Sequence, residues 1–200
     1  MKNRCVETIK VCGRKLFNLP YHQARMDRTR SELYGCPQSS GIMLEEILTH
    51  RLPDTEALLK CRVEYDTEIR RIEFLPYKTP VIHRLKKVFD NDIHYKYKFA
   101  ERGGLERLHA LAAGYDDALI IRDGLITDTT FCNVALFDGY HWLTPADPLL
   151  RGTKRQELLD HGMLIEKNIP AGWIPEFQAV ALFNAMNDFG SLLVPVSEIY

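Results

Sequence analysis

Two Asp-Gly dipeptides constrain the fold of this 200-residue chain more than any other feature. Asp123-Gly124 separates the apolar runs 118–122 and 125–127, and Asp138-Gly139 separates 132–137 from 141–143. Asp-Gly readily adopts the positive φ angles of tight hairpin turns, so each pair of runs predicts an antiparallel hairpin. Parallel strands would need long crossover connections instead. The pattern therefore disfavours a doubly wound parallel sheet.

Hydrophobic periodicity and turn residues define the remaining elements. We expect helices at residues 20–33, 42–48, 103–113 and 153–161, and further strands at 5–12, 15–19, 57–65, 69–76, 81–89 and 177–183. The residues beyond 183 are expected to be irregular. Because hairpins alternate with helices along the chain, the pattern predicts an α+β fold.

Pro76 and Pro80 mark the best internal boundary, because two prolines so close together interrupt both helices and strand ladders. We therefore expect a small N-terminal α+β domain at residues 1–78 and a larger C-terminal domain at residues 79–200. The cleft between two domains is a usual position for a cofactor.

Composition and charge exclude several functional classes. The chain carries 26 Lys and Arg against 27 Asp and Glu, which argues against a dedicated nucleic-acid-binding protein. No apolar run reaches the ~18 residues that span a bilayer, and the first residues lack the apolar region of a signal peptide. The five cysteines form no Cys-x-x-Cys pair, which is typical of a reduced, cytoplasmic protein. The seven histidines lack metal-ligand spacing, so no metal site is expected.

Two basic segments are candidates for binding chemistry. In residues 150–155, a glycine precedes the expected helix at 153–161, whose first N–H groups favour a phosphate. An ordinary helix start is the alternative. In residues 93–102, aromatic residues alternate with Lys96 and Lys98. An edge strand with solvated lysines gives this pattern, whereas a lysine held inside would lose its proton more easily and act as a nucleophile.

Four segments, taken in order, resemble the class IV aminotransferase family, which includes branched-chain aminotransferase, D-amino acid aminotransferase and aminodeoxychorismate lyase. They are Lys98-Phe-Ala-Glu-Arg102, Asp123-Gly-Leu-Ile-Thr-Asp-Thr-Thr-Phe-Cys-Asn133, Trp142-Leu-Thr-Pro145 and Leu150-Arg-Gly-Thr-Lys-Arg155. The resemblance extends over nearly the whole chain. It implies a two-domain α+β fold of type IV, similar to D-amino acid aminotransferase, with the cofactor pyridoxal 5'-phosphate (PLP) and a homodimer.

The resemblance implies a catalytic lysine and an acid. Lys98 matches the family's Schiff-base lysine, and Lys-x-x-x-Arg is the form that the lyases show there. Lys96 is the rival, since it would face the same side of a strand. Asp128 falls where the family has a Glu that faces the pyridine nitrogen of PLP; an acid there keeps the nitrogen protonated and improves the ring as an electron sink. A turn or cap role is the alternative for Asp128.

Five further cofactor contacts are implied. Arg25, in His-x-x-Arg, matches an arginine that holds the PLP phosphate, which a guanidinium can meet with two hydrogen bonds; a solvated helix arginine is the alternative. Gly152, Thr153 and Lys154 match the phosphate cradle, with the hydroxyl one position earlier than in the common Gly-Ile-Thr-Arg. Ala185 stands where some relatives have a phosphate-binding Thr, so that contact is absent or made by the backbone.

Arg62 is the candidate for substrate binding. It matches a strand arginine that meets substrate carboxylates in some relatives. A structural ion pair with Glu64, Glu68 or Glu73 is the alternative.

The resemblance predicts a PLP-dependent class IV aminotransferase-like enzyme that acts on an amino acid or amino-substituted carboxylate through a lysine Schiff base and α-proton abstraction. One alternative is 4-amino-4-deoxychorismate lyase of the folate pathway, which releases pyruvate and 4-aminobenzoate; Lys98 with Arg102, and Asn184-Ala185, favour it. Asp128 and the short segment before the 5–12 strand depart from both types. The alternative of another class is a non-catalytic protein of the same fold that binds an anionic ligand.

Overall fold

The computed structural model describes residues 4–37 and 41–200, which form two compact units. Unit 1 combines Met1–Thr79 with Tyr97–Glu101, and unit 2 combines Pro80–Lys96 with Arg102–Tyr200. Residues 1–3, on which the expectation about a signal peptide partly rests, lie outside the described residues. The domain division at residues 78 and 79 stays a prediction. After that point the chain returns once to unit 1, through residues 97–101.

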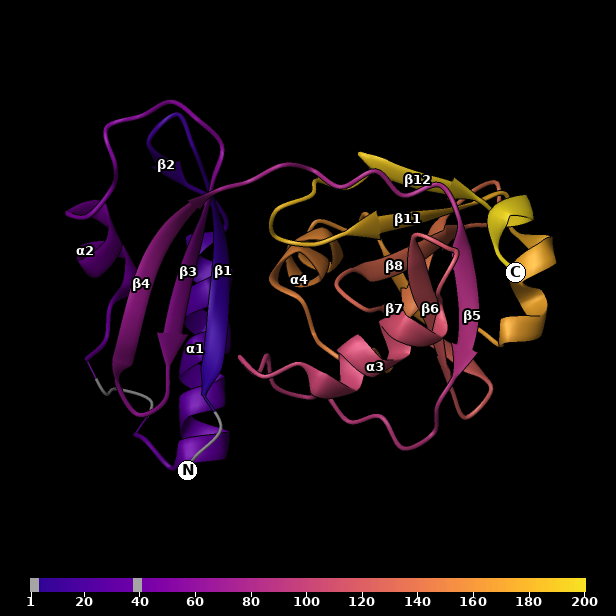
Figure 1. Ribbon diagram of the computed structural model, residues 1–200, viewed down its shortest axis with the longest axis horizontal. Coiled ribbons are helices and arrows are strands. Elements are labelled where there is room, and N and C mark those ends of the chain that lie inside the picture. Colours follow the sequence, from indigo (N-terminus) through magenta and orange to yellow (C-terminus); the bar gives the residue numbers. More distant parts are fainter. Residues whose placement is uncertain (1–3, 38–40) are drawn as a thin grey trace. The chain divides into compact units, whose positions relative to one another are not determined.

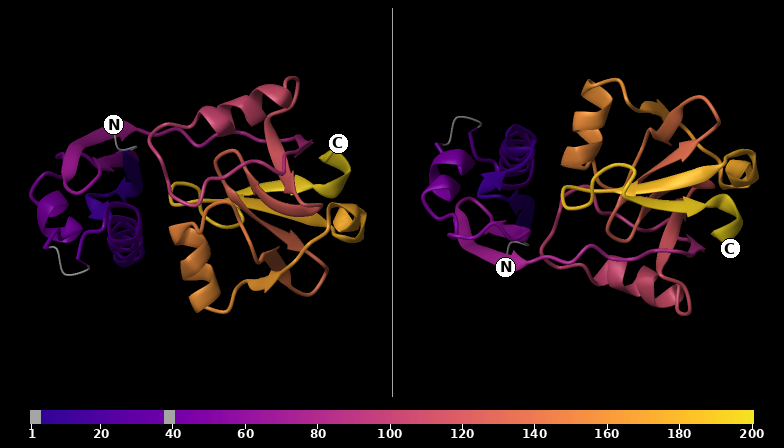
Figure 2. Two further views of the ribbon diagram at one scale, coloured as in Figure 1. Left: turned by 90° about the horizontal axis from the view of Figure 1, so that it is seen from below. Right: turned by 90° about the horizontal axis from the view of Figure 1, so that it is seen from above.

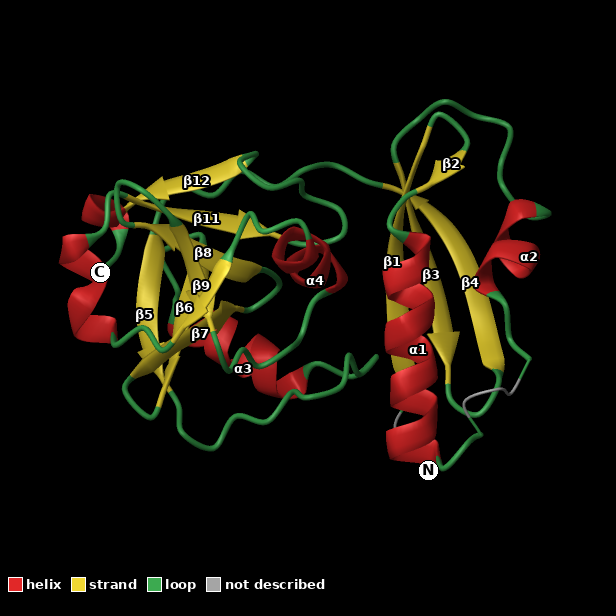
Figure 3. Ribbon diagram, turned by 180° about the vertical axis from the view of Figure 1, so that it is seen from behind, coloured by secondary structure: helices red, strands yellow, loops and turns green. Residues whose placement is uncertain are grey.

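Unit 1 is an antiparallel sheet with the strand order β2-β1-β3-β4, and α1 covers one of its faces (Figures 1 and 3). Its elements are β1 (Cys5–Cys12), β2 (Lys15–Leu16), α1 (Leu19–Tyr34), α2 (Leu44–Thr49), β3 (Leu59–Tyr65) and β4 (Ile69–Pro76). Alternate residues of β1 and β3 point to the helix side, where Ile9 and Val63 pack with Met26 of α1. The period-2 pattern of the strands therefore places the core of unit 1 between sheet and helix.

The expected strand at residues 15–19 is shorter than predicted. β2 ends at Leu16, because Asn18 adopts a left-handed conformation with a φ of 59° and turns the chain into α1. Pro20 then occupies the first turn of α1, where its missing N–H costs nothing. The start of α1 near Pro20 therefore ends the strand earlier than the apolar residues at 16, 17 and 19 indicate.

Unit 2 is built on a larger mixed sheet. Its elements are β5 (Leu85–Phe89), α3 (Gly103–Leu111), β6 (Asp117–Arg122), β7 (Leu125–Thr129), β8 (Asn133–Phe137), β9 (Trp142–Pro145), α4 (Thr153–Asp160), β10 (Ile165–Lys167), the 3-10 helix η1 (Ala171–Glu176), β11 (Ala179–Phe183), β12 (Leu192–Pro195) and the 3-10 helix η2 (Val196–Glu198). The strand order is β10-β9-β8-β7-β6-β5, with β11 pairing with both β8 and β12.

The strands of unit 2 curl around one apolar core. Seven of them contribute to a cluster that includes Leu119, Val134, Val180 and Val194. The helices α3 and α4 lie on opposite sides of the strands (Figure 2). At the far end of the sheet, residues 199–200 return to β5: Ile199 pairs with Leu85, and the Tyr200 N–H donates to the Leu85 carbonyl over 3.0 Å. The first strand of this unit and the last residues of the chain therefore contribute to the same core, whereas Leu158 of α4 packs in a second cluster with Ala181 and Phe183.

The α+β prediction and both predicted hairpins are confirmed. β6 and β7 pair antiparallel around Asp123 and Gly124, whose φ angles of 52° and 76° suit a two-residue turn. β8 and β9 pair around residues 138–141, where the Asp138 carboxylate accepts hydrogen bonds from the Tyr140 and His141 N–H groups. The prediction missed β10, and the C-terminal residues that were expected to be irregular contain β12. The strand expected at residues 81–89 begins only at Leu85.

The sheet core generates a stability prediction. Leu119 of β6 is fully buried, whereas Leu193 of β12 is 49% exposed. We expect Leu119→Ala to lower the free energy of unfolding by about 2–5 kcal/mol, because it removes buried methyl groups and leaves a cavity. The control Leu193→Ala should change it by less than about 1 kcal/mol. Urea denaturation measures both, and equal losses would contradict this description of the core.

Candidate active site

Unit 1 holds a buried acid–base cluster centred on Glu7. The alternation of β1 turns Glu7 toward α1, among apolar residues, and its side chain is fully buried. One carboxylate oxygen accepts from Arg25 Nε over 2.9 Å, and the other lies 2.5 Å from Arg25 Nη2 and 2.6 Å from His22 Nδ1. Since an ionised carboxylate only accepts, His22 Nδ1 carries a hydrogen. His22 and Arg25 reach the same carboxylate because three residues span about one helical turn.

The charges of this cluster are set by mutual compensation. Burial alone would raise the pKa of Glu7, but the charge of Arg25 and the hydrogen bond from His22 outweigh it and lower that pKa to about 2. Burial lowers the pKa of His22, and the charges of Arg25 and Lys98 lower it further, against the opposing effect of Glu7. At neutral pH the cluster therefore contains an ionised Glu7, a cationic Arg25 and a neutral His22.

Arg25 is the residue assigned to the PLP phosphate by resemblance. Its Nε and Nη2 form the edge best suited to a two-bond contact, and in the structure this edge binds Glu7. A contact of Arg25 with phosphate would therefore have to be made in addition to, or in competition with, this contact to Glu7. The phosphate role stays a prediction, but the two-bond geometry expected for it is used by Glu7.

Lys98 lies beside β1 in unit 1. Its carbonyl accepts from the Val6 N–H over 2.8 Å, and the next residue, Phe99, pairs with Cys5. The Lys98 side chain is partly buried, and its charge acts on His22. Lys96, the rival, is exposed and belongs to unit 2. Apart from the pairing at Phe99, residues 93–100 form no strand, so the expectation that both lysines share one strand face was wrong.

Asp128 is a buried acid of unit 2, with 4% of its surface exposed. It lies on β7, and three neutral groups hold it: Asn133 Nδ2 donates to Oδ1 over 2.6 Å, the Leu150 N–H donates to Oδ2 over 3.0 Å, and the Leu149 N–H also contributes. Burial raises the pKa of Asp128 to about 6, despite these hydrogen bonds and the charge of Arg155. Among residues 4–37 and 41–200, no cation forms an ion pair with Asp128. The turn or cap role considered for Asp128 does not describe this burial.

The N-terminus of α4 lies just after Leu150 in the sequence. Gly152 precedes the helix without a side-chain cap, and the first turn carries Lys154 and Arg155 but no acid. Cations at a helix N-terminus oppose the helix dipole, whereas an anion there is stabilising. Lys154 lies 2.7 Å from Glu157, and Arg155 is buried against Glu166 and the Pro145 carbonyl. Thr153 is also buried. The predicted phosphate contacts of Gly152, Thr153 and Lys154 stay a prediction, and the side chain of Lys154 already forms an ion pair with Glu157.

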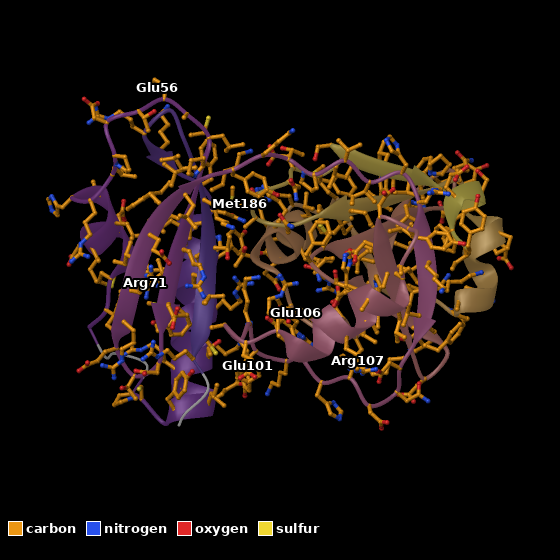
Figure 4. All side chains as sticks on the ribbon, in the orientation of Figure 1. Glu56, Arg71, Glu101, Glu106, Arg107 and Met186 are labelled. Carbon is orange, nitrogen blue, oxygen red and sulfur yellow. The ribbon has the colours of Figure 1, made fainter. Side chains whose placement is uncertain are left out.

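Ala185 lies in the loop that follows β11, next to Met186 (Figure 4). The preceding Asn184 organises this loop: its Oδ1 accepts from the Met186 and Asn187 N–H groups, and its Nδ2 donates to the Phe131 carbonyl over 3.1 Å. Ala185 itself offers no polar side chain. Its predicted contribution to the cofactor site is therefore limited to its backbone.

Arg62 forms structural ion pairs, the alternative to its predicted role in substrate binding. It lies 2.8 Å from Glu64 and 3.6 Å from Glu73, and not against Glu68. Arg71 of β4 pairs with the same Glu73 (Figure 4). Because two carboxylates already neutralise Arg62, its predicted role in substrate binding would require a contact that competes with them.

Sequence reasoning missed Glu7, His22 and Asn133. A signal existed for Glu7, since it is the one acid among the otherwise apolar inward positions of β1.

No described group of three or more His, Cys, Asp or Glu side chains could hold a metal. Within the described residues, no helix combines the length and apolar character needed to cross a membrane.

Comparison with known proteins decides the family. The profile of amino-transferase class IV matches residues 101–199. An uncharacterised protein of Haemophilus influenzae is 31% identical over 181 residues, covering 90% of this chain and 96% of that protein. The chain belongs to the class IV aminotransferase family.

Solved structures of the family share the type IV fold. A candidate 4-amino-4-deoxychorismate lyase from Haemophilus somnus has a TM-score of 0.88 at 29% identity, over 94% of this chain and 98% of that one. A hypothetical aminotransferase from Mycobacterium tuberculosis, solved with PLP bound, has a TM-score of 0.79 at 17% identity, over 99% and 81% of the two chains. The predicted α+β fold of type IV is thereby confirmed, and it contains two sheets.

The Glu7 cluster generates a prediction about acid stability. We expect Glu7→Gln to lower the free energy of unfolding at pH 7 by about 3–5 kcal/mol, because Arg25 then remains buried without its counter-charge. The pKa of Glu7 is lower in the folded state, so its contribution is complete above pH 5 and is lost as the pH falls toward 2. Urea denaturation as a function of pH measures the difference between variant and wild type.

The matched control is Asp54→Asn, which removes another carboxylate–arginine pair. Asp54 lies 2.6 Å from Arg14, but its side chain is 91% exposed. Its loss should cost less than about 1 kcal/mol at any pH. A Glu7→Gln effect no larger than that of the control, or one that does not shrink in acid, would show that the cluster is not held by charge compensation.

Proposed function

We propose that this protein is a PLP-dependent enzyme that acts on the amino group of an amino acid or an amino-substituted carboxylate. The observation that carries the proposal is Asp128, a buried carboxylate that neutral donors hold in place. Burying a carboxylate without a counter-ion is costly, so a site of this kind suits a cationic ligand atom. A protonated pyridine nitrogen is such an atom, and Asp128 therefore fits the cofactor.

The N-terminus of α4 supports the same ligand. It begins within the segment whose Leu150 N–H donates to Asp128, and its first turn favours an anion. PLP carries a cation-forming nitrogen and a phosphate on one ring. We assign Gly152 and Thr153 to the phosphate through their N–H groups, with Lys154, Arg25 and the backbone of Ala185 as further phosphate contacts.

When bound, PLP supplies an aldehyde that condenses with amines and a ring that accepts electron density from the substrate α-carbon. In our proposal, Lys98 provides the amine that holds the cofactor. The amine of Lys98 would also serve as the base that takes a proton from the substrate α-carbon. Asp128 holds the proton on the pyridine nitrogen, and the opposite charge of that nitrogen would lower the pKa of Asp128 below its raised value of about 6. Arg62 is assigned to the substrate carboxylate.

A second candidate reaction is that of 4-amino-4-deoxychorismate lyase, which releases pyruvate and 4-aminobenzoate. The structure from Haemophilus somnus, which bears that name, favours it, as do Lys98 with Arg102 and Asn184-Ala185. Both reactions begin with removal of a proton from the α-carbon, so the same lysine and acid serve either one. We further propose that the enzyme is a homodimer, which sedimentation of the purified protein measures.

The assignment of the lysine generates a prediction. We expect wild-type protein and Lys96→Ala to bind PLP with a visible absorbance band, and to retain the cofactor covalently after reduction with borohydride. Lys98→Ala should give no covalent adduct, because it lacks the amine. Mass spectrometry of the reduced protein measures the adduct and its position.

The two lysine variants serve as controls for each other. If Lys96→Ala loses the adduct while Lys98→Ala retains it, the lysine assignment is wrong. If wild-type protein neither gains the band nor forms an adduct, the enzyme proposal fails. The non-catalytic protein that binds an anionic ligand is then the better description.

A third experiment separates the two reactions. The protein is given 4-amino-4-deoxychorismate alone, and separately L- and D-amino acids with 2-oxoglutarate as amino acceptor. Pyruvate released without an acceptor identifies a lyase, whereas glutamate formed only with the acceptor identifies an aminotransferase. In either reaction Asp128→Asn should lower the rate at least about 100-fold, because the ring nitrogen loses the charge that keeps it protonated.

A further inference from the structure

Asn133 connects two parts of unit 2 that sequence reasoning treated separately. It begins β8 directly opposite Asp128 of β7, and it is 7% exposed. Its Nδ2 donates to Asp128 Oδ1 over 2.6 Å and to the Leu150 carbonyl over 2.8 Å. Both hydrogens of one amide nitrogen are thereby used, one on the acid and one on the segment that leads into α4.

The oxygen of the same Asn133 amide explains why residue 152 is a glycine. A Cβ atom added to Gly152 would lie 2.0 Å from Asn133 Oδ1, far inside any van der Waals contact. The backbone of Gly152 has a φ of −68° and a ψ of 150°, a conformation that every residue adopts freely. Glycine is therefore required at this position for space and not for its backbone flexibility. The space is taken by Asn133.

A return contact closes the arrangement. The Leu150 N–H donates to Asp128 Oδ2 over 3.0 Å, so that Asp128, Asn133 and Leu150 form a ring of three hydrogen bonds. Each member restrains the other two. A ring of this kind fixes distances better than separate hydrogen bonds do, because no member can move alone.

We propose that Asn133 is a positioning residue that fixes the Asp128 carboxylate relative to the N-terminus of α4. It thereby sets the spacing for one ligand that has a cationic ring nitrogen at one end and a phosphate at the other. The assignment of this ligand rests on the proposed function. The coupling between Asp128 and Gly152 concerns the protein alone.

The first test therefore uses the protein without any cofactor. The charged form of Asp128 is favoured by Asn133, by the Leu149 and Leu150 N–H groups and by Arg155, while Asp128 and the buried Cys132 also interact. In Asn133→Ala the charged form loses its shortest hydrogen bond. We expect the pKa of Asp128 to rise from about 6 by about one unit, measured by carbon-13 NMR of the aspartate carboxyls with Asp128→Asn to assign the signal.

The second test uses paired substitutions. Gly152→Ala alone should weaken binding of pyridoxamine 5'-phosphate at least tenfold, because its Cβ displaces Asn133 or the helix start. In Asn133→Ala the space is free, so adding Gly152→Ala should weaken binding less than twofold further. This failure of additivity is expected only if the two residues act through direct contact. Additive losses would overturn the coupling.

The third test compares two ligands that do not react with Lys98. Pyridoxamine 5'-phosphate uses both ends of the site, whereas inorganic phosphate uses the α4 end alone. We expect Asn133→Ala to weaken the first at least tenfold and the second less than threefold, measured by calorimetry. Equal losses for both ligands would contradict a spacing role.

A structural control and a milder variant complete the design. Thr144 of β9 is also buried and donates to the Val134 carbonyl over 2.8 Å, but it touches neither Asp128 nor Gly152. Thr144→Val should leave the pKa of Asp128 and both affinities unchanged. Asn133→Ser, which keeps a smaller donor, should lie between wild type and Asn133→Ala. If Asn133→Ala behaves as Thr144→Val does, the proposal is wrong.

The outcomes distinguish this proposal from the proposed function. If wild-type protein binds no pyridoxamine 5'-phosphate, the proposed function fails and the spacing role for that ligand fails with it. A shift in the pKa of Asp128 would still support the coupling within the protein. If wild type binds tightly while Asn133→Ala changes neither the pKa nor the affinities, the function stands and the role of Asn133 is overturned.

Discussion

The cost of removing a carboxylate from water governs both candidate clusters of this protein. Unit 1 buries Glu7 and compensates it with the full charge of Arg25, so the group stays ionised and the cluster is complete in itself. Unit 2 buries Asp128 and offers it only N–H donors and the more distant charge of Arg155. The same physical constraint thus gives a structural ion pair in one unit and a carboxylate able to receive a cation in the other.

The fold was largely predictable because local signals agreed with tertiary packing. Asp123 and Gly124 adopt the turn that their residue types favour, and Pro20 begins the helix it indicated. The errors have a different cause. β10 consists of three exposed residues, and β12 is a four-residue strand that pairs with β11, so neither carries a hydrophobic pattern long enough to indicate a strand by itself. Residues 93–100 carry a strand-like alternation, but the backbone pairs with β1 only around Phe99 and forms a bridge instead of a strand.

For the candidate site, the sequence indicated which residues are important better than it indicated which residues they contact. The buried position of Asp128 agrees with its predicted importance, whereas the two-bond edge of Arg25 faces Glu7 instead of a phosphate. Neither Glu7 nor Asn133 could be assigned a role from its neighbours in sequence, because their partners lie on another strand or helix. Gly152 illustrates the limit most clearly: its sequence context suggested a phosphate loop, and only the position of Asn133 shows why a side chain is excluded there.

The pairing of residues 199–200 with β5 has a consequence for the order of folding. β5 is the first strand of unit 2 in the sequence, yet its Leu85 carbonyl accepts a hydrogen bond from the Tyr200 N–H, and its Lys87 N–H donates to the Tyr200 carbonyl. Contacts between such distant segments close large loops, which slows folding and delays the final step until the whole segment has been synthesised. The hairpins β6–β7 and β8–β9 can form early from local contacts. Until residues 199–200 pair with β5, one edge of β5 remains exposed. During this interval the chain is most open to incorrect strand pairing.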